Sequence, residues 1–124
     1  MRNAKWVAVP IVVCAVLAMC QQAQAQCPEC VALMQEAAAL EEHIESTEQA
    51  IVDLEVEIHG YQLDIVALLQ VPESQRGSWW DAAMLDVYFS WEDANSKLDT
   101  ENAILYQLGL DLENVEKDIS ECGC

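Results

Sequence analysis

Apolar residues recur along the chain at alternating steps of four and three, in two long series separated by a short break. This spacing places one apolar stripe along a helix and is typical of helices that pack as a left-handed coiled coil. The first series is Cys30, Leu33, Ala37, Leu40, Ile44, Thr47, Ile51, Leu54, Ile58, Tyr61, Ile65 and Leu68. The second is Trp80, Met84, Val87, Trp91, Ala94, Leu98, Glu101, Leu105, Leu108, Leu112, Val115, Ile119 and Cys122. The pattern predicts two long helices and no strand.

The break between the two series predicts a turn. Pro72 cannot continue a helix interior, because it lacks a backbone N–H and its ring clashes with the preceding turn. Gly123 suits the left-handed position that commonly ends a helix. We therefore expect helices at 28–71 and 79–122, joined by a turn at 72–78.

Two helices of equal length joined by a short turn predict an antiparallel pair, in which each helix buries the apolar stripe of the other. Facing residues then have a constant sum of residue numbers, and pairing Cys30 with Cys122 fixes this sum at 152. The same sum pairs Ile44 with Leu108 and matches apolar positions along the remaining length. Thr47 in the first series and Glu101 in the second are polar exceptions. We expect the Glu101 carboxylate to tilt toward solvent; the alternative is a polar layer that specifies register or partner.

The first residues predict a targeting segment. Arg2 and Lys5 precede an apolar run that is short for a bilayer span, and small residues follow it, as in a cleaved secretory signal at 1–25. The alternative is lipidation of Cys20, which would tether the protein to a membrane. We therefore predict an all-α fold for residues 26–124, a two-helix antiparallel coiled-coil hairpin that is secreted or periplasmic.

Four cysteines remain after this signal, and all lie at the two ends of the hairpin. An even number in a small exported domain predicts disulfides. The register predicts the pairs Cys30 with Cys122 and Cys27 with Cys124, and we expect neither a metal nor a cofactor. Two alternatives use the same sulfurs: a tetrahedral zinc site, or a thiol-exchange site in the first Cys-x-x-Cys pair.

The charge of the chain narrows the range of partners. It carries 22 acidic residues against 5 basic ones, a formal net charge of -17. Nucleic acids and anionic lipid headgroups are therefore excluded as partners, because binding phosphate needs positive charge. Neither a catalytic motif nor a phosphate-binding glycine loop occurs, so we expect that the protein is not an enzyme.

Apolar residues also occupy outward heptad positions, which should be polar in an isolated hairpin. Such patches usually mark a protein contact, so we expect self-association into a four-helix bundle or binding of another exported protein. Trp79 lies one position off the buried stripe and is expected to pack over the turn or to contact a partner. The candidate contact residues are Val52, Val56, Leu63, Val66, Trp79, Leu85, Phe89, Ala103, Tyr106 and Leu110.

Together these features predict an exported structural or protein-interaction module that docks through outer apolar stripes near the turn. One alternative is a holdase chaperone regulated by redox state or zinc, which would expose its apolar stripe when the cysteines open. A second alternative is a lipid-tethered spacer of the cell envelope.

Overall fold

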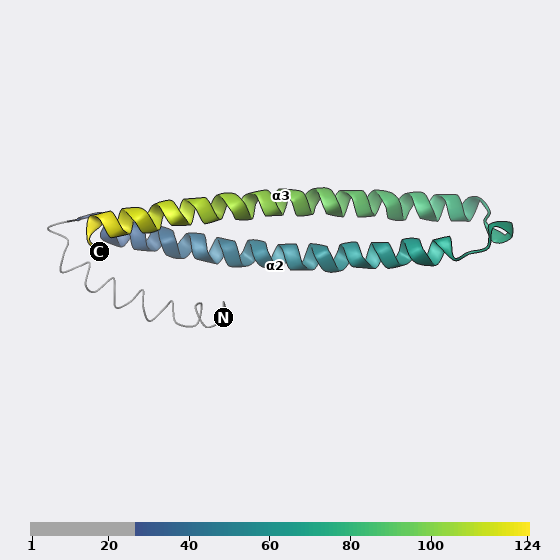
Figure 1. The fold of residues 1–124 in the computed structure, drawn as a ribbon, viewed down its shortest axis with the longest axis horizontal. Coiled ribbons are helices and arrows are strands. Elements are labelled where there is room, and N and C mark those ends of the chain that lie inside the picture. Colours follow the sequence, from purple (N-terminus) through teal and green to yellow (C-terminus); the bar gives the residue numbers. More distant parts are fainter. Residues whose placement is uncertain (1–26) are drawn as a thin grey trace. The chain divides into compact units, whose positions relative to one another are not determined.

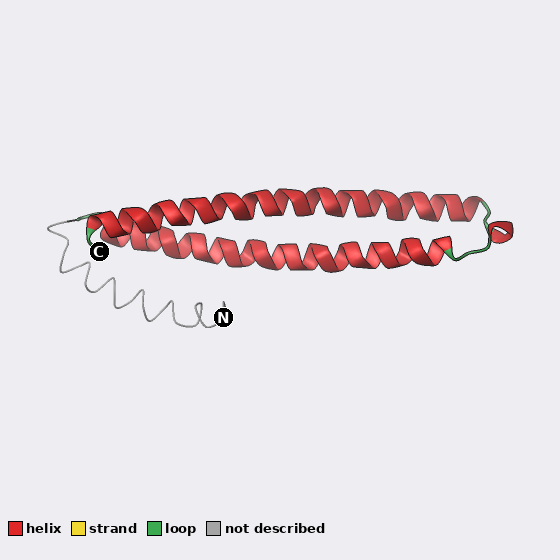
Figure 2. Ribbon diagram, viewed as in Figure 1, coloured by secondary structure: helices red, strands yellow, loops and turns green. Residues whose placement is uncertain are grey.

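The computed structural model describes residues 27–124, and the predicted signal at 1–25, including Cys20, lies outside them. The described chain forms helix α2 (Cys30–Leu69), a single 3-10 turn η1 (Glu73–Gln75) and helix α3 (Ser78–Cys122). Figures 1 and 2 show the two helices side by side and running in opposite directions, with no strand in the described part. The predicted all-α helical hairpin is confirmed.

Both ends of the first helix lie inside the predicted range 28–71. At the start, the N–H of Cys30 bonds to the carbonyl of Cys27 at 3.3 Å, a turn that precedes the regular helix. At the end, the N–H of Val71 bonds three residues back to Leu68, at 3.2 Å. The helix stops there because the residue before a proline is disfavoured in helical conformation.

The turn is fastened by two side chains whose roles the sequence pattern did not predict. The Arg76 guanidinium donates from Nε to the carbonyl of Val71 at 2.9 Å and from Nη2 to that of Leu69 at 3.0 Å. It also lies 4.5 Å from the ring centroid of Trp80, whose indole N–H donates to Leu68 at 2.7 Å. These bonds satisfy carbonyls that the end of a helix leaves without partners.

The buried core follows the predicted stripes. The chain divides into two compact units, of which the first comprises residues 27–44 and 107–124 and the second Glu45–Tyr106. Every position of both predicted series is buried or partly buried, and Glu101 is partly buried among them. The buried residues of the first unit are Cys27, Cys30, Ile44, Leu108 and Val115, and those of the second are Thr47, Ile51, Ile58 and Ala94. The coiled-coil periodicity is therefore confirmed in each unit.

Candidate functional sites: the cysteine cluster and the outer apolar face

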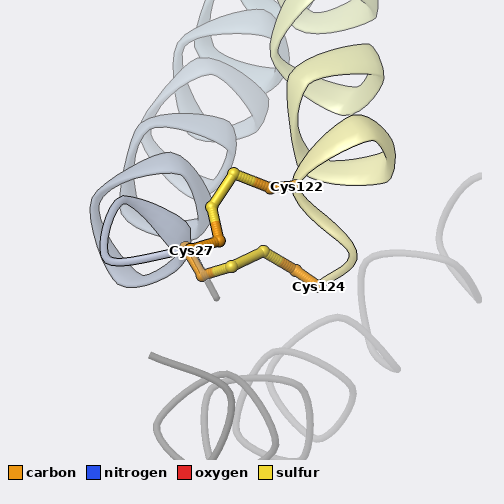
Figure 3. The surroundings of a disulfide bond; sticks show 4 residues. Cys27, Cys122 and Cys124 are labelled. Atoms are coloured by element: carbon orange, nitrogen blue, oxygen red, sulfur yellow. A yellow bond between two sulfur atoms is a disulfide. The ribbon is translucent and has the colours of Figure 1, made fainter. Parts of the chain in front are cut away.

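The four cysteines form two disulfides within the first unit. Cys27 bonds to Cys122, with 5.6 Å between Cα atoms, and Cys30 bonds to Cys124, with 6.1 Å between Cα atoms (Figure 3). The prediction that these four residues form two disulfides between the helices is confirmed. The predicted partners were wrong, because the pairing is exchanged.

The end of α3 explains the exchange. Gly123 adopts a φ of 76°, the left-handed conformation that glycine reaches without strain. The N–H of Gly123 bonds to the carbonyl of Ser120 at 3.2 Å, and the N–H of Cys124 bonds to that of Ile119 at 3.3 Å. This is the Schellman arrangement, which folds the last residue back over the final helical turn. Cys124 is thereby carried to Cys30 instead of continuing outward along the helix.

The other disulfide follows from the start of α2. Cys27 precedes the first helical residue, and its side chain is only 5% exposed. Cys30 is fully buried at 0%. The predicted pairing came from the register of the apolar stripes, which places Cys30 level with Cys122. In the structure Cys122 bonds instead to Cys27, which precedes α2, and Cys30 bonds to Cys124 at the returning chain end.

A second property of this cluster is its compactness. All four sulfur atoms lie within 4.8 Å of one another, a spacing at which one metal ion could contact the whole set. A shallow groove of about 360 Å³ beside Cys122 is lined by Leu33 and by three carboxylates, those of Glu29, Asp118 and Glu121. The cluster therefore combines four convergent sulfurs with a negatively charged approach.

The candidate contact residues of the outer stripes are exposed, as heptad positions away from the partner helix should be. Their exposed fractions run from 37% for Leu110 to 70% for Tyr106. Leu69, Tyr88 and Ile104 are exposed as well, although the outer stripes did not include them. The remaining exposed candidates are Val52, Val56, Leu63, Val66, Trp79, Leu85 and Phe89, with Ala103 also exposed. Their role in binding stays a prediction.

Within the second unit, a groove shows which outward positions of the two helices share one side. It has a volume of about 400 Å³ and is lined by Gln62, Ile65 and Val66 of α2 and by Tyr88 and Trp91 of α3. Two of these, Ile65 and Trp91, belong to the buried stripes, so the stripe itself is open to solvent here.

Helical periodicity extends this side along both helices, because residues three or four apart share a face. Between residues 62 and 70 and between residues 82 and 91, the charged residues are Asp64 and Asp86, and Glu92 follows directly, hydrogen-bonded to the Tyr88 hydroxyl. We call the exposed large apolar residues of these two stretches the outer apolar face; its members are Leu63, Val66, Leu69, Leu85, Tyr88 and Phe89.

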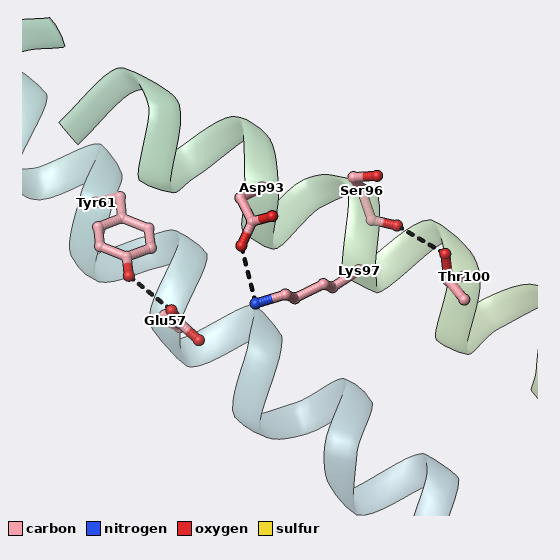
Figure 4. Close-up of polar contacts among 6 residues, drawn as sticks. All are labelled: Glu57, Tyr61, Asp93, Ser96, Lys97 and Thr100. Carbon is pink, nitrogen blue, oxygen red and sulfur yellow. Dashed lines mark hydrogen bonds and ion pairs between the residues drawn. The ribbon is translucent and has the colours of Figure 1, made fainter. Parts of the chain in front are cut away.

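A cluster of polar side chains from both helices lies in the same unit (Figure 4). The Tyr61 hydroxyl donates to Glu57 at 2.6 Å, and this bond, with the nearby charges of Asp93 and Asp64, raises the pKa of Tyr61. Lys97 forms an ion pair with Asp93 at 2.8 Å, and that contact together with the charge of Glu57 raises the pKa of Lys97. Carboxylates from both helices therefore lie close together in this cluster, and at the groove the Tyr88 hydroxyl is hydrogen-bonded to Glu92.

Trp79 lies over the turn. A Cβ atom added to Gly77 would be 3.2 Å from Cδ1 of this indole, so the ring covers the glycine. The side chain is nevertheless 53% exposed. Of the two roles expected for Trp79, the structure therefore shows packing over the turn and leaves half of the ring accessible to a partner.

Neither helix within residues 27–124 contains an apolar stretch long enough to cross a membrane. Comparisons with protein-family models, with curated proteins and with solved structures found no match to this chain. The chemistry of the cysteine cluster and of the outer apolar face is therefore the basis for assigning a function.

Proposed function

We propose that the protein is an exported structural module that associates with a second copy of itself through the outer apolar face, forming a four-helix bundle. The observation that carries this proposal is the concentration of exposed apolar side chains in residues 62–70 and 82–91 of the second unit, two of which, Val66 and Tyr88, line an open groove. The disulfides support export, because such bonds persist in oxidising compartments.

The energetics favour a reversible contact. Fully burying a large aliphatic or aromatic side chain contributes about 1.5 to 3 kcal/mol, so six roughly half-exposed side chains on each copy contribute on the order of 10 kcal/mol. Association itself costs about 4 to 15 kcal/mol in lost freedom of motion. The surplus is small, and this predicts a concentration-dependent dimer instead of an obligate one.

The distribution of charge favours a second copy over a basic partner. Two copies that meet through their outer apolar faces bring mostly uncharged side chains together, with the Glu92 carboxylate, which is hydrogen-bonded to the Tyr88 hydroxyl, beside the contact. A basic protein would be attracted instead to the acidic cluster around Glu57. The open groove adds a further reason, because a second hairpin would cover Trp91 and complete the core at this level.

Sedimentation equilibrium tests this proposal on the mature exported protein with its disulfides intact. We expect the average mass to rise from monomer to dimer as concentration increases. The double variant Val66→Gln/Phe89→Gln should remain monomeric, because it places polar groups in the centre of the face. The matched control is Ile104→Gln, an exposed apolar residue outside the outer apolar face.

Two results would refute the proposed contact. One is a wild-type protein that stays monomeric at the highest soluble concentration. The other is a dimer that survives the double variant but is lost in Ile104→Gln, which would place the interface elsewhere. Far-ultraviolet circular dichroism of each variant shows that the helices remain folded.

A further inference from the structure

We infer that the four cysteines, once reduced, form a tetrathiolate zinc site that holds the two chain ends together in place of the disulfides. This inference does not depend on the proposed dimer, because the cysteines and the outer apolar face lie in different units. Zinc in proteins is commonly held by four cysteine thiolates in tetrahedral geometry.

The positions of the sulfur atoms fit this geometry. Zinc–sulfur bonds of about 2.3 Å at tetrahedral angles place the four sulfurs about 3.8 Å apart. In the structure they all lie within 4.8 Å of one another. Opening the two disulfides lengthens two of the six sulfur–sulfur separations, and the remaining ones need changes on the order of 1 Å. Side-chain rotation can supply such shifts without moving the helices.

The convergence of the sulfurs does not depend on the disulfides alone. Backbone hydrogen bonds fix the left-handed turn at Gly123 and the approach of Cys124 to the last helical turn. At the other end, the bond from Cys30 to Cys27 fixes the spacing of the first pair. The buried side chain of Val115 belongs to the apolar core of the same unit. Reduction therefore releases the sulfurs while local geometry keeps them close.

The surroundings of the four sulfur atoms favour cysteine thiolates bound to a cation. Cys30 is the first residue of α2, where the partial positive charge of a helix N-terminus favours a negatively charged group. Cys27 and Cys30 are buried, so water competes poorly for the metal. Four thiolates so close to one another would repel, and a divalent ion relieves that repulsion.

The conversion balances as two steps. Each disulfide takes two electrons and two protons from a dithiol reductant, which becomes a disulfide, so that two dithiols yield four cysteine thiols. The thiols then release four protons as they bind one Zn²⁺, which leaves a complex with a charge of 2−. The oxidised chain has no free thiol in residues 27–124 and cannot bind the ion in this way.

Cobalt(II) is the probe for this site, because tetrahedral sulfur coordination gives it an intense visible spectrum and a thiolate charge-transfer band. We expect the anaerobically reduced full-length mature protein to develop both features with one equivalent of cobalt, and zinc to bleach them by displacement. The disulfide-bonded protein should show neither. Cys30→Ser should lose the four-sulfur spectrum, and so should Cys124→Ser, whose substitution at the chain end spares the buried core.

The matched control is Glu121→Gln, which changes a carboxylate beside the cluster and leaves the sulfurs in place. We expect its cobalt spectrum to match that of the wild type. The inference is overturned if the reduced wild type gives only the weak spectrum of octahedral cobalt bound by carboxylates. It is equally overturned if the oxidised and reduced proteins give the same spectrum, or if both cysteine variants keep the four-sulfur bands.

Discussion

The two disulfides should be strongly non-additive, because they close nearly the same ring. The test perturbation removes either bridge alone, as Cys27→Ala/Cys122→Ala or Cys30→Ala/Cys124→Ala, and then both bridges together. The bonded residues are 95 and 94 positions apart, so whichever bridge forms first constrains almost the whole described chain.

The chain-entropy relation gives the size of each effect. Closing a loop of roughly 100 residues lowers the entropy of the unfolded chain by an amount that stabilises the fold by about 4.7 kcal/mol. Once one bridge exists, the other closes only a small ring formed by residues 27–30 and 122–124, for which the same relation gives about 2 kcal/mol. Removing one bridge should therefore cost about 2 kcal/mol, and removing both should cost about 6 to 7 kcal/mol.

Urea unfolding followed by circular dichroism at 25 °C measures these differences, at concentrations where sedimentation shows monomers. The two single-bridge variants should unfold at similar urea concentrations, on the order of 1 M below that of the wild type, and the variant without bridges at a much lower one. If each single-bridge variant loses nearly as much stability as the variant without bridges, the shared-ring reasoning is wrong. If the variant without bridges is as stable as the wild type, the bridges do not stabilise the fold.

The further predictions address four residues: Ile58, Gly60, Gly123 and Tyr61. Ile58→Ala should lower the free energy of unfolding by about 2 to 4 kcal/mol in urea titration, because a buried isoleucine leaves a cavity; a loss below 1 kcal/mol would show that the second unit is loosely packed. Gly60→Ala should stabilise by about 0.5 to 1 kcal/mol, because the helix gains a better former and the Cβ meets nothing within 4 Å. Gly123→Ala should instead destabilise by roughly 1 kcal/mol, because its φ of +76° strains any L side chain although the space is equally open; equal melting-temperature shifts of both variants would contradict this. Tyr61 should titrate above its usual pKa of 10.0, because its hydroxyl donates to Glu57 and the nearby acids oppose a phenolate. Because the folded pKa is raised, the resulting stability is fully present below the unfolded pKa of 10.0 and is lost as the pH rises through the higher folded pKa. NMR of the phenol ring should show a lower pKa in Glu57→Gln, and an unchanged midpoint would refute this cause.

The periodicity of the sequence predicted the helices and their buried sides, because a coiled-coil core repeats the same local requirement every turn. The periodicity predicts burial even at polar positions: Thr47 and Glu101 are both polar, and both lie at buried or partly buried positions of the stripe. A single polar residue does not shift the register when apolar neighbours on either side fix it.

The turn was less predictable. Its place followed from Pro72, but the clamp made by Arg76 depends on a long flexible side chain that reaches backbone carbonyls several residues away. Sequence spacing carries no signal for such a contact, because a side chain of this length could reach many different backbone carbonyls. The packing of Trp79 over Gly77 is likewise a contact that sequence spacing does not predict.

The amino-acid sequence by itself determined the two helices, the residues they bury, the acidity of their surface and the presence of cysteines at both ends. Tertiary structure decided which sulfur meets which, because a single left-handed residue at Gly123 turns Cys124 back toward Cys30. It also decided that Val66 of one helix and Tyr88 of the other line the same groove, since that depends on how one helix is rotated against the other. Periodicity is a property of one helix, whereas these two features depend on contacts between residues far apart in the chain.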